Sequence, residues 1–261
     1  MTDVMNGYDV RVFTAPIAGG ASVSHEVYER GEGPPVVIIQ ELPGIGPETL
    51  RLADRFVDAG FRVVLPHLFG PLGKVSMVGN VVRVFCMRKE FRIFAKAESS
   101  PIVDWLRALC RDVRDAAGIR GVGVIGMCLT GNFAFSLMAD DSVLAAIASQ
   151  PSLPILDKHG LHMSEAEIAS VRQHLDAEGP MYAYRFDGDF LCTQEKLEAI
   201  AKRFNDDGTE RVKLVTLPGK GHSVLTLDFV DEEGHPTARA LDSILTYFGE
   251  KLRADQTSGA R

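Results

Sequence analysis

Cysteine is scarce in this sequence, and its placement argues against two classes of protein. The four cysteines, Cys86, Cys110, Cys128 and Cys192, are scattered and form no Cys-x-x-Cys pair. A zinc knuckle or a disulfide framework needs clustered or regularly spaced cysteines, so neither is indicated. We expect free thiols in a reducing compartment, and no metal site.

Long apolar runs and blocks of basic charge are also missing. No apolar stretch approaches the ~20 residues that span a bilayer, and the start of the chain lacks the basic and apolar segments of a secretory signal. Lys and Arg total 28 against 35 Asp and Glu, a net charge of -7, with no dense basic block to follow a phosphate backbone. We therefore expect a cytoplasmic protein that binds neither membrane nor nucleic acid.

What remains is the composition of an ordinary globular protein, with 46% hydrophobic and 24% charged residues in 261. No internal repeat or low-complexity linker divides the chain. Since α/β folds commonly reach about 250 residues as one domain, we predict a single domain over residues 1–261. It would begin with a hairpin at about 10–30, followed by a core at about 35–252.

Short apolar runs alternate with helical patterns along this core. Runs bounded by glycine and proline read as strands buried on both faces, and the stretches between them carry apolar residues at helical spacing. This alternation predicts an α/β fold, a mostly parallel sheet with helices on both faces. The expected strands of the core are residues 36–39, 62–65, 122–125, 144–149, 181–186 and 212–217.

The stretch from 121 to 138 is the one around which the chain is organised. A strand pattern stops at Gly126-Met127-Cys128-Leu129-Thr130-Gly131 and passes into an apolar helical pattern. Small residues on both sides of a strained tip residue are typical of a nucleophile elbow. Unpaired amides at a helix start stabilise a thiolate, so Cys128 is the candidate nucleophile. The alternative is a small buried cysteine that only packs.

Two later strand ends supply a candidate acid and base. Asp189 follows the strand at 181–186, and His222 follows the strand at 212–217. In parallel sheets these ends share one edge, and the order nucleophile, acid, base matches that of α/β-hydrolases. Asp187 is the rival acid. Both aspartates could instead be turn residues, and a Gly-His-Ser loop could be a simple turn.

Basic residues and histidines elsewhere are less informative. Arg88, Arg92 and Lys96 recur every fourth residue on one expected helix face, whose default state is solvation. The functional alternative is that an arginine of this region, Arg83, Arg88 or Arg92, binds an anionic substrate through its planar guanidinium. The histidines at 159, 162 and 174 fit no zinc pattern and are predicted to be surface or loop residues.

The motifs together resemble the dienelactone hydrolase family. The matching residues are Gln40-Glu41, Pro66-x-Leu68, Gly126-x-Cys128-Leu129-x-Gly131, Asp189 and Gly221-His222-Ser223. The resemblance implies an α/β-hydrolase fold and hydrolysis of a lactone or small carboxylic ester through a Cys-Asp-His triad, without a cofactor. Thr130 departs from the family pattern, which has glycine there, and should narrow the pocket or re-aim the elbow helix. His67 also departs from the family pattern, which more often has aspartate between Pro66 and Leu68.

The same resemblance assigns further roles around the triad. Glu41 would contact the resting thiol, and the amides of Leu42 and Leu129 would form the oxyanion hole. Ser223 is a further candidate for contact with a small ester or lactone, which could be anionic. The alternatives are a Cys-dependent thioesterase or acyltransferase, or a catalytically silent binding protein on the same fold. The oligomeric state is not indicated.

Overall fold

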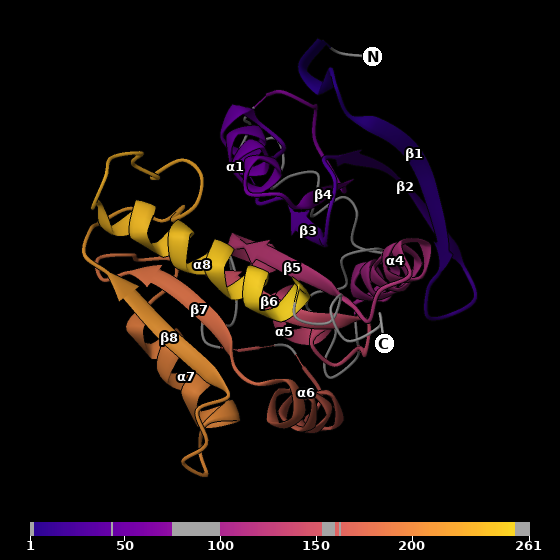
Figure 1. Ribbon diagram of the computed structural model, residues 1–261. Helices are drawn as coiled ribbons and strands as arrows, with labels where there is room; N and C mark the ends of the chain where they lie inside the picture. The colour runs from indigo at the N-terminus through magenta and orange to yellow at the C-terminus, as the bar shows by residue number, and fades with distance from the viewer. Residues whose placement is uncertain (1–2, 43, 75–99, 153–159, 162, 254–261) are drawn as a thin grey trace.

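Eight strands form one sheet in a computed structural model that describes residues 3–42, 44–74, 100–152, 160–161 and 163–253 (Figure 1). Their order across the sheet is β1-β2-β4-β3-β5-β6-β7-β8. β1 and β2 pair antiparallel, as do β2 and β4, and every later neighbour is parallel. The bounds are β1 Asp9–Pro16, β2 Ser22–Arg30, β3 Pro35–Ile39, β4 Arg62–His67, β5 Val122–Met127, β6 Val143–Ser149, β7 Met181–Phe186 and β8 Val212–Leu217.

Helices cover both faces of this sheet, as the alternating pattern predicts (Figure 1). α4, α5, α6 and α7 pack on one face, and α1 and α8 pack on the other. Two short 3-10 helices, η1 and η2, precede β1 and α5. The bounds are η1 Asp3–Met5, α1 Pro47–Asp58, α4 Pro101–Ala117, η2 Cys128–Thr130, α5 Gly131–Leu137, α6 Glu165–Glu178, α7 Gln194–Phe204 and α8 Pro236–Arg253.

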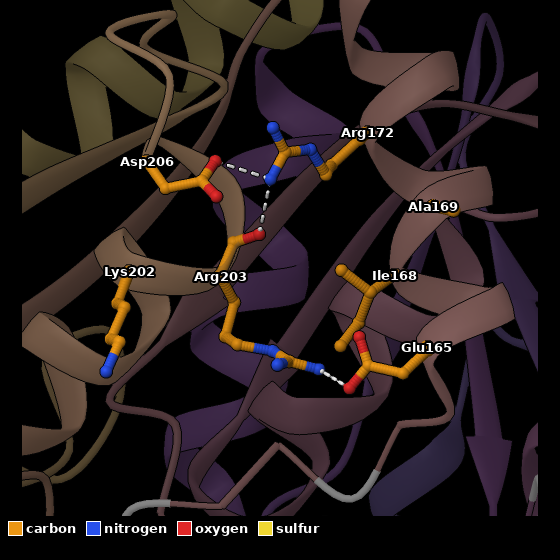
Figure 2. A pocket seen from close by; sticks show the side chains of 7 residues that line it. All are labelled: Glu165, Ile168, Ala169, Arg172, Lys202, Arg203 and Asp206. Atoms are coloured by element: carbon orange, nitrogen blue, oxygen red, sulfur yellow. Dashed lines mark hydrogen bonds and ion pairs between the residues drawn. The ribbon is translucent and has the colours of Figure 1, made fainter.

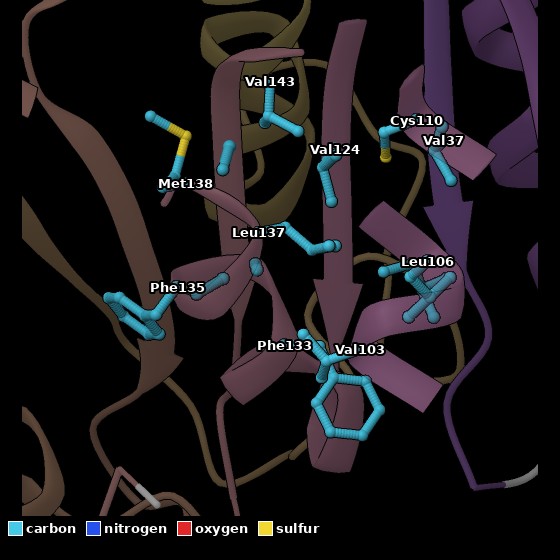
Figure 3. Packing of buried hydrophobic residues seen from close by; sticks show 14 of the residues in the cluster. Val37, Val103, Leu106, Cys110, Val124, Phe133, Phe135, Leu137, Met138 and Val143 are labelled. Carbon is cyan, nitrogen blue, oxygen red and sulfur yellow. The ribbon is translucent and has the colours of Figure 1, made fainter. Parts of the chain in front are cut away.

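Each face of the sheet has its own apolar core, because side chains alternate along a strand. On β3, Val37 and Ile39 point to the α4–α5 side, whereas Val36 and Ile38 point to the α1–α8 side. Figure 3 shows the first core, where Phe133 and Leu137 of the short helix α5 meet the α4 side chains. Both faces of the central strands are therefore shielded from water, which explains their continuous apolar sequences.

The N-terminal hairpin is an integral part of the sheet. β2 adds antiparallel to β4 and carries β1 at the edge, with Asp9 opposite Glu29. Glu29 is buried and bonds Arg11 of β1 and Arg62 of β4. Burial raises the pKa of Glu29, but these two guanidinium groups outweigh burial and lower it. The hairpin is thus joined to the core by charge as well as by strand pairing.

The ends of α4 and the segment around His174 show further local detail. α4 begins after Ser100, whose side chain makes no capping hydrogen bond, and it ends at Gly118, which has a left-handed conformation. The segment around His174 is the helix α6, not loop. His174 is partly exposed, and its Nε2 lies 2.9 Å from the carbonyl oxygen of Val143, so of the predicted surface or loop position only the loop is excluded.

The parallel strands bring their carboxyl ends to one edge of the sheet. Residues that follow β3, β5, β6, β7 and β8 therefore lie near one another although they are far apart in sequence. In the described part of the chain, no helix is both long and apolar enough to cross a membrane.

Candidate active site

The turn after β5 is a strained elbow with Cys128 at its tip. Cys128 has φ 57, a left-handed conformation that is uncommon outside glycine. Gly126 is required because a β-carbon there would lie 2.2 Å from the carbonyl oxygen of Thr130. Gly131 is required because a β-carbon there would approach Pro151 Cα to 2.9 Å. The predicted strand, sharp turn and helix are confirmed, and the role of Cys128 as nucleophile stays a prediction.

Thr130 occupies the position at which glycine was expected, and its hydroxyl is used inside the fold. The side chain is fully buried. Its Oγ1 accepts a hydrogen bond from the Met127 amide at 3.0 Å and lies 3.1 Å from the Gln40 carbonyl and 2.9 Å from the Met127 carbonyl. Thr130 therefore joins the end of β3 to the elbow. Its polar contacts do not involve Cys128.

Asp189 and His222 meet from the loops after β7 and β8. His222 Nδ1 lies 2.7 Å from Asp189 Oδ2, and since a carboxylate only accepts, Nδ1 carries the proton. The second oxygen, Asp189 Oδ1, accepts from the amides of Leu191 and Cys192 at 2.8 and 3.0 Å. The Asp189 side chain is fully buried. Its two oxygens are therefore both occupied, which fixes the orientation of the carboxylate toward the imidazole.

A buried arginine supports the loop that carries Asp189. Arg185, in β7, donates from Nε to the Cys192 carbonyl at 2.7 Å. Its Nη2 donates to the carbonyl oxygens of Asp187 at 3.0 Å and Asp189 at 3.4 Å. The guanidinium thereby ties both ends of the loop to β7. The role of Arg185 is not visible in the sequence, because it depends on backbone carbonyls that only the fold brings together.

The electrostatics of His222 depend on both of its neighbours. Burial lowers the pKa of His222, but the hydrogen bond to Asp189 and the proximity of Cys128 outweigh burial and raise the pKa to about 10. The second ring nitrogen, Nε2, is buried and has no hydrogen-bond partner of normal geometry in the described part of the chain. His222 can therefore exchange a proton at Nε2 while Asp189 holds Nδ1.

Asp187, the rival acid, is placed differently. Its Oδ1 accepts a hydrogen bond from the Gly219 amide at 2.9 Å, and its side chain is exposed. This contact ties the loop after β7 to the loop after β8, as expected for a turn aspartate. His222 contacts Asp189 and not Asp187, so the geometry favours the first choice of the sequence analysis.

Glu41 is buried in a cage of hydrogen-bond donors. Its Oε2 accepts from Ser223 Oγ at 3.0 Å and from Gln150 Nε2 at 3.3 Å, and its Oε1 accepts from Thr226 Oγ1. Burial raises the pKa of Glu41 and outweighs the two hydroxyls and His222, which lower it. Among the described residues Glu41 makes no hydrogen bond to the Cys128 sulfur, and its implied contact with the resting thiol stays a prediction. The carboxylate instead ties together the loops after β3, β6 and β8.

Ser223 and its neighbours fix the loop that carries His222. The Asp228 carboxylate accepts from the amides of His222 at 2.8 Å and Ser223 at 2.9 Å. A β-carbon at Gly221 would lie 2.6 Å from Asp228 Cγ, so glycine is needed for this close approach. Ser223 is 3% exposed and already donates to Glu41. Its contact is therefore with Glu41, and a contact with substrate stays a prediction.

The loop after β6 contributes residues that sequence analysis left out. Ser152 Oγ lies 3.4 Å from Cys128 Sγ, and the Ser152 amide donates to the Cys128 carbonyl at 3.1 Å. Gln150, which bonds Glu41, has φ 36, and it and Cys128 are the two described non-glycine residues with positive φ. The signal available in the sequence was the polar string Ser149-Gln150-Pro151-Ser152 at the end of an apolar strand.

The two candidate oxyanion amides come from different strand ends. Leu42 follows β3 and Leu129 follows Cys128, and both residues are buried. The Leu129 amide lies in the first turn of η2, where amides lack partners within the helix. The candidate arginines Arg83, Arg88 and Arg92, together with Lys96, Cys86, His159 and His162, lie outside the described residues.

A separate surface hollow of about 200 Å³ lies between α6 and α7 (Figure 2). It is bordered by two ion pairs, Arg203 with Glu165 at 2.5 Å and Arg172 with Asp206 at 2.5 Å. None of the candidate catalytic residues lines it. The described residues also contain no group of three or more His, Cys, Asp or Glu side chains arranged to hold a metal ion.

Comparison with known proteins gives one family and one fold. The sequence pattern of the dienelactone hydrolase family matches residues 23–252, whereas no curated protein matches the sequence. A dienelactone hydrolase from Anabaena variabilis shares 14% identity and a TM-score of 0.56, covering 95% of this chain and 100% of that chain. A cold-adapted esterase from an Arctic intertidal metagenomic library shares 16% sequence identity with a TM-score of 0.61, and the match covers 95% of each chain. Carboxyl esterase 2 from the fungus Tuber melanosporum shares 12% sequence identity with a TM-score of 0.59, and the match covers 95% of this chain and 88% of that chain. At these identities the structures show a shared fold alone.

Proposed function

The chain belongs to the dienelactone hydrolase family, with its α/β-hydrolase fold and its hydrolysis of ester bonds, and on this premise we propose that it cleaves a small carboxylic ester or lactone through Cys128, His222 and Asp189. The observation that carries the proposal is the 2.7 Å contact between His222 Nδ1 and Asp189 Oδ2, which leaves Nε2 buried without a hydrogen-bond partner of normal geometry among the described residues. Cys128, at the strained tip of the elbow, lies beside His222.

The first half of the reaction forms an acyl-enzyme. His222 Nε2 takes the proton of the Cys128 thiol, and the thiolate attacks the carbonyl carbon of the ester. A C–S bond forms, and the π electron pair moves to the carbonyl oxygen, where the amides of Leu42 and Leu129 stabilise the negative charge. When the carbonyl re-forms, the C–O bond to the leaving alkoxide breaks, and His222 returns its proton to that oxygen. In a lactone the leaving oxygen remains attached to the acyl chain.

The second half releases the acid. Water gives a proton to His222 Nε2 and attacks the thioester carbonyl, which forms a C–O bond and again places charge at the two amides. The C–S bond then breaks, the sulfur keeps its electron pair, and His222 reprotonates the sulfur. Asp189 keeps Nδ1–H oriented throughout and stabilises the imidazolium in both halves. No group other than the protein side chains and water is needed to balance these steps.

Substrate size follows from the burial of the nucleophile. Cys128 is 7% exposed, with Ser152 and His222 beside it. A compact acyl group can therefore reach its sulfur more easily than a bulky one. An anionic substituent on that substrate would need a cationic partner, for which Arg83, Arg88 and Arg92 remain the candidates. Glu41 then acts as a positioning residue that holds the loops of Ser223 and Gln150.

The test is the Cys128→Ala variant with p-nitrophenyl acetate and a small lactone as substrates. We expect loss of hydrolysis by several orders of magnitude with little change in thermal unfolding, because only one sulfur is removed. In wild type, rapid quenching and peptide mass spectrometry should find the acetyl group on the peptide containing Cys128. Retention of most activity in Cys128→Ala would end the proposal.

A further inference from the structure

A serine hydroxyl reaches the candidate nucleophile from the loop after β6. Ser152 Oγ lies 3.4 Å from Cys128 Sγ, and the exposed fractions of the two residues are 4% and 7%. Within the described ranges, the sulfur is the only hydrogen-bond partner of this hydroxyl. The contact is therefore shielded from water and is specific to one pair of atoms.

The backbone of Ser152 is held on both sides, so the hydroxyl is positioned by the fold. The Ser152 amide donates to the Cys128 carbonyl at 3.1 Å, and the Ser152 carbonyl accepts from Asn132 Nδ2 at 3.1 Å. Asn132 also donates to the Leu129 carbonyl at 3.2 Å, and its Oδ1 accepts from the buried Lys196 at 2.8 Å. The loop thus docks on the elbow itself, through the first residues of η2 and α5.

The same loop carries a backbone conformation that needs support. Gln150 has φ 36, which costs conformational free energy in a residue with a side chain. Its side chain is held by Glu41 on one side and by the Ser149 hydroxyl on the other. Strained residues persist where surrounding contacts enforce them, often at functional sites. Here the strained residue is two positions before the hydroxyl that meets the thiol.

The direction of the hydrogen bond follows from the surrounding acceptors. When Cys128 is a neutral thiol and His222 a neutral imidazole, the thiol has one proton, and His222 Nε2 is the acceptor beside it that has no other partner of normal geometry among the described residues. With that proton directed to the imidazole, the sulfur can only accept from Ser152. After the proton moves to His222, the thiolate also only accepts. The Ser152 hydroxyl is therefore the donor in both states.

We infer that Ser152 is a further catalytic residue, whose hydroxyl donates a hydrogen bond to the Cys128 sulfur and stabilises the thiolate. This inference rests on the proposed function, because it needs Cys128 to be the nucleophile. The hydroxyl favours thiolate formation before attack and again when the C–S bond of the acyl-enzyme breaks and sulfur keeps the electron pair. No proton leaves Ser152 in either step.

The thiol has other titratable neighbours, and the test must separate them. His222 and Cys192 interact electrostatically with Cys128, while Glu41 and Asp189 act through His222. All four stay in place when only the Ser152 hydroxyl is removed. Burial, with Asp189 nearby, raises the pKa of Cys192 to about 12, so this thiol should label slowly and serve as an internal reference.

The experiment is the pH dependence of iodoacetamide labelling at Cys128, read by peptide mass spectrometry. Ser152→Ala should raise the apparent pKa of Cys128 by about one unit, the size expected for losing a hydrogen bond to a charged group, and should lower kcat about tenfold. Ser152→Thr keeps the hydroxyl and should label as wild type does. Ser170→Ala removes an exposed hydroxyl of α6 that bonds the Ala166 carbonyl, and it should leave the Cys128 labelling curve unchanged.

Ser152→Val provides a second comparison, because valine has the shape of threonine with a methyl group in place of the hydroxyl. If the added methyl group perturbs the fold, thermal unfolding shows it equally in both, and the Val-to-Thr difference in apparent pKa still isolates the hydroxyl. Superimposable curves, or a lower apparent pKa in Ser152→Ala, would overturn the inference and leave the proposed function intact. Hydrolysis that survives in Cys128→Ala would instead remove the proposed function.

Discussion

Replacing Asp189 by asparagine should disable His222 without unfolding the protein. In the structure, Asp189 Oδ2 accepts from His222 Nδ1, and Oδ1 accepts from the amides of Leu191 and Cys192. An asparagine must present its NH2 group to one of these sets of donors. The two backbone amides are fixed, so the NH2 group should face the imidazole. His222 then escapes the donor clash only by moving its proton to Nε2.

The magnitude follows from this change of tautomer. A proton on Nε2 prevents His222 from accepting the Cys128 proton, and loss of Asp189 also removes the main cause of the raised His222 pKa. When the acid of a catalytic triad becomes an amide, the rate falls on the order of 10⁴-fold, as it does in serine proteases. The near-identical shape of asparagine should keep the melting temperature within a few degrees.

The assay is steady-state hydrolysis of p-nitrophenyl acetate, with Asp187→Asn as the matched control. Asp187 uses Oδ1 to accept from Gly219, and an asparagine keeps that oxygen on an exposed side chain, so its rate should stay within about twofold. A larger loss in Asp187→Asn than in Asp189→Asn would refute the assignment of the acid. Equal and small losses would refute the tautomer argument as a whole.

Three further outcomes are expected. Glu41→Gln replaces one accepting oxygen with an NH2 group that can only donate, which removes an acceptor from the contacts with Ser223, Thr226 and Gln150, so it should lower turnover and the melting temperature together, and unchanged values would contradict a positioning role. Thr130→Val removes the acceptor of the buried Met127 amide and should reduce the free energy of unfolding by about 1–3 kcal/mol in urea melts, a reduction that Thr130→Ser should avoid. The folded-state pKa of His222, about 10, lies above its ordinary 6.5, so its stabilising effect is complete below about pH 6.5 and is lost as pH rises through about 10. Urea midpoints should show that decline in wild type and lack it in His222→Gln.

The strands and the elbow were predictable because their signals are local. Apolar runs between glycine and proline gave the core strands to within a few residues, and Gly126 and Gly131 marked the turn at Cys128. The contact of Asp189 with His222 was predictable because parallel strands end at one edge. The sequence left Asp187 as a rival to Asp189, and it is the contact with His222 that separates the two.

Other features depend on contacts between distant segments. α6 was missed because its apolar positions, Ile168, Val171 and Leu175, are few among charged residues. Ser164 and Glu167 form a capping box whose sequence signature was present and could have marked the start of this helix. The contacts of Thr226 with Glu41 and of Ser152 with Cys128 were not predictable, because both residues reach their partners across loops and the sequence does not show which loops meet.

The tight elbow also sets limits for directed evolution of this enzyme. Every replacement of glycine adds at least a β-carbon, and at position 126 that carbon would meet the carbonyl oxygen of Thr130 at 2.2 Å. Any replacement of Gly126 therefore forces the backbone of the elbow to move, and we expect variants at this position to lose activity. Position 130 can accept serine in place of threonine, since serine supplies the same hydroxyl. A library for new substrates should leave both positions unchanged and direct its variation to side chains around Cys128 that bear no such backbone constraint.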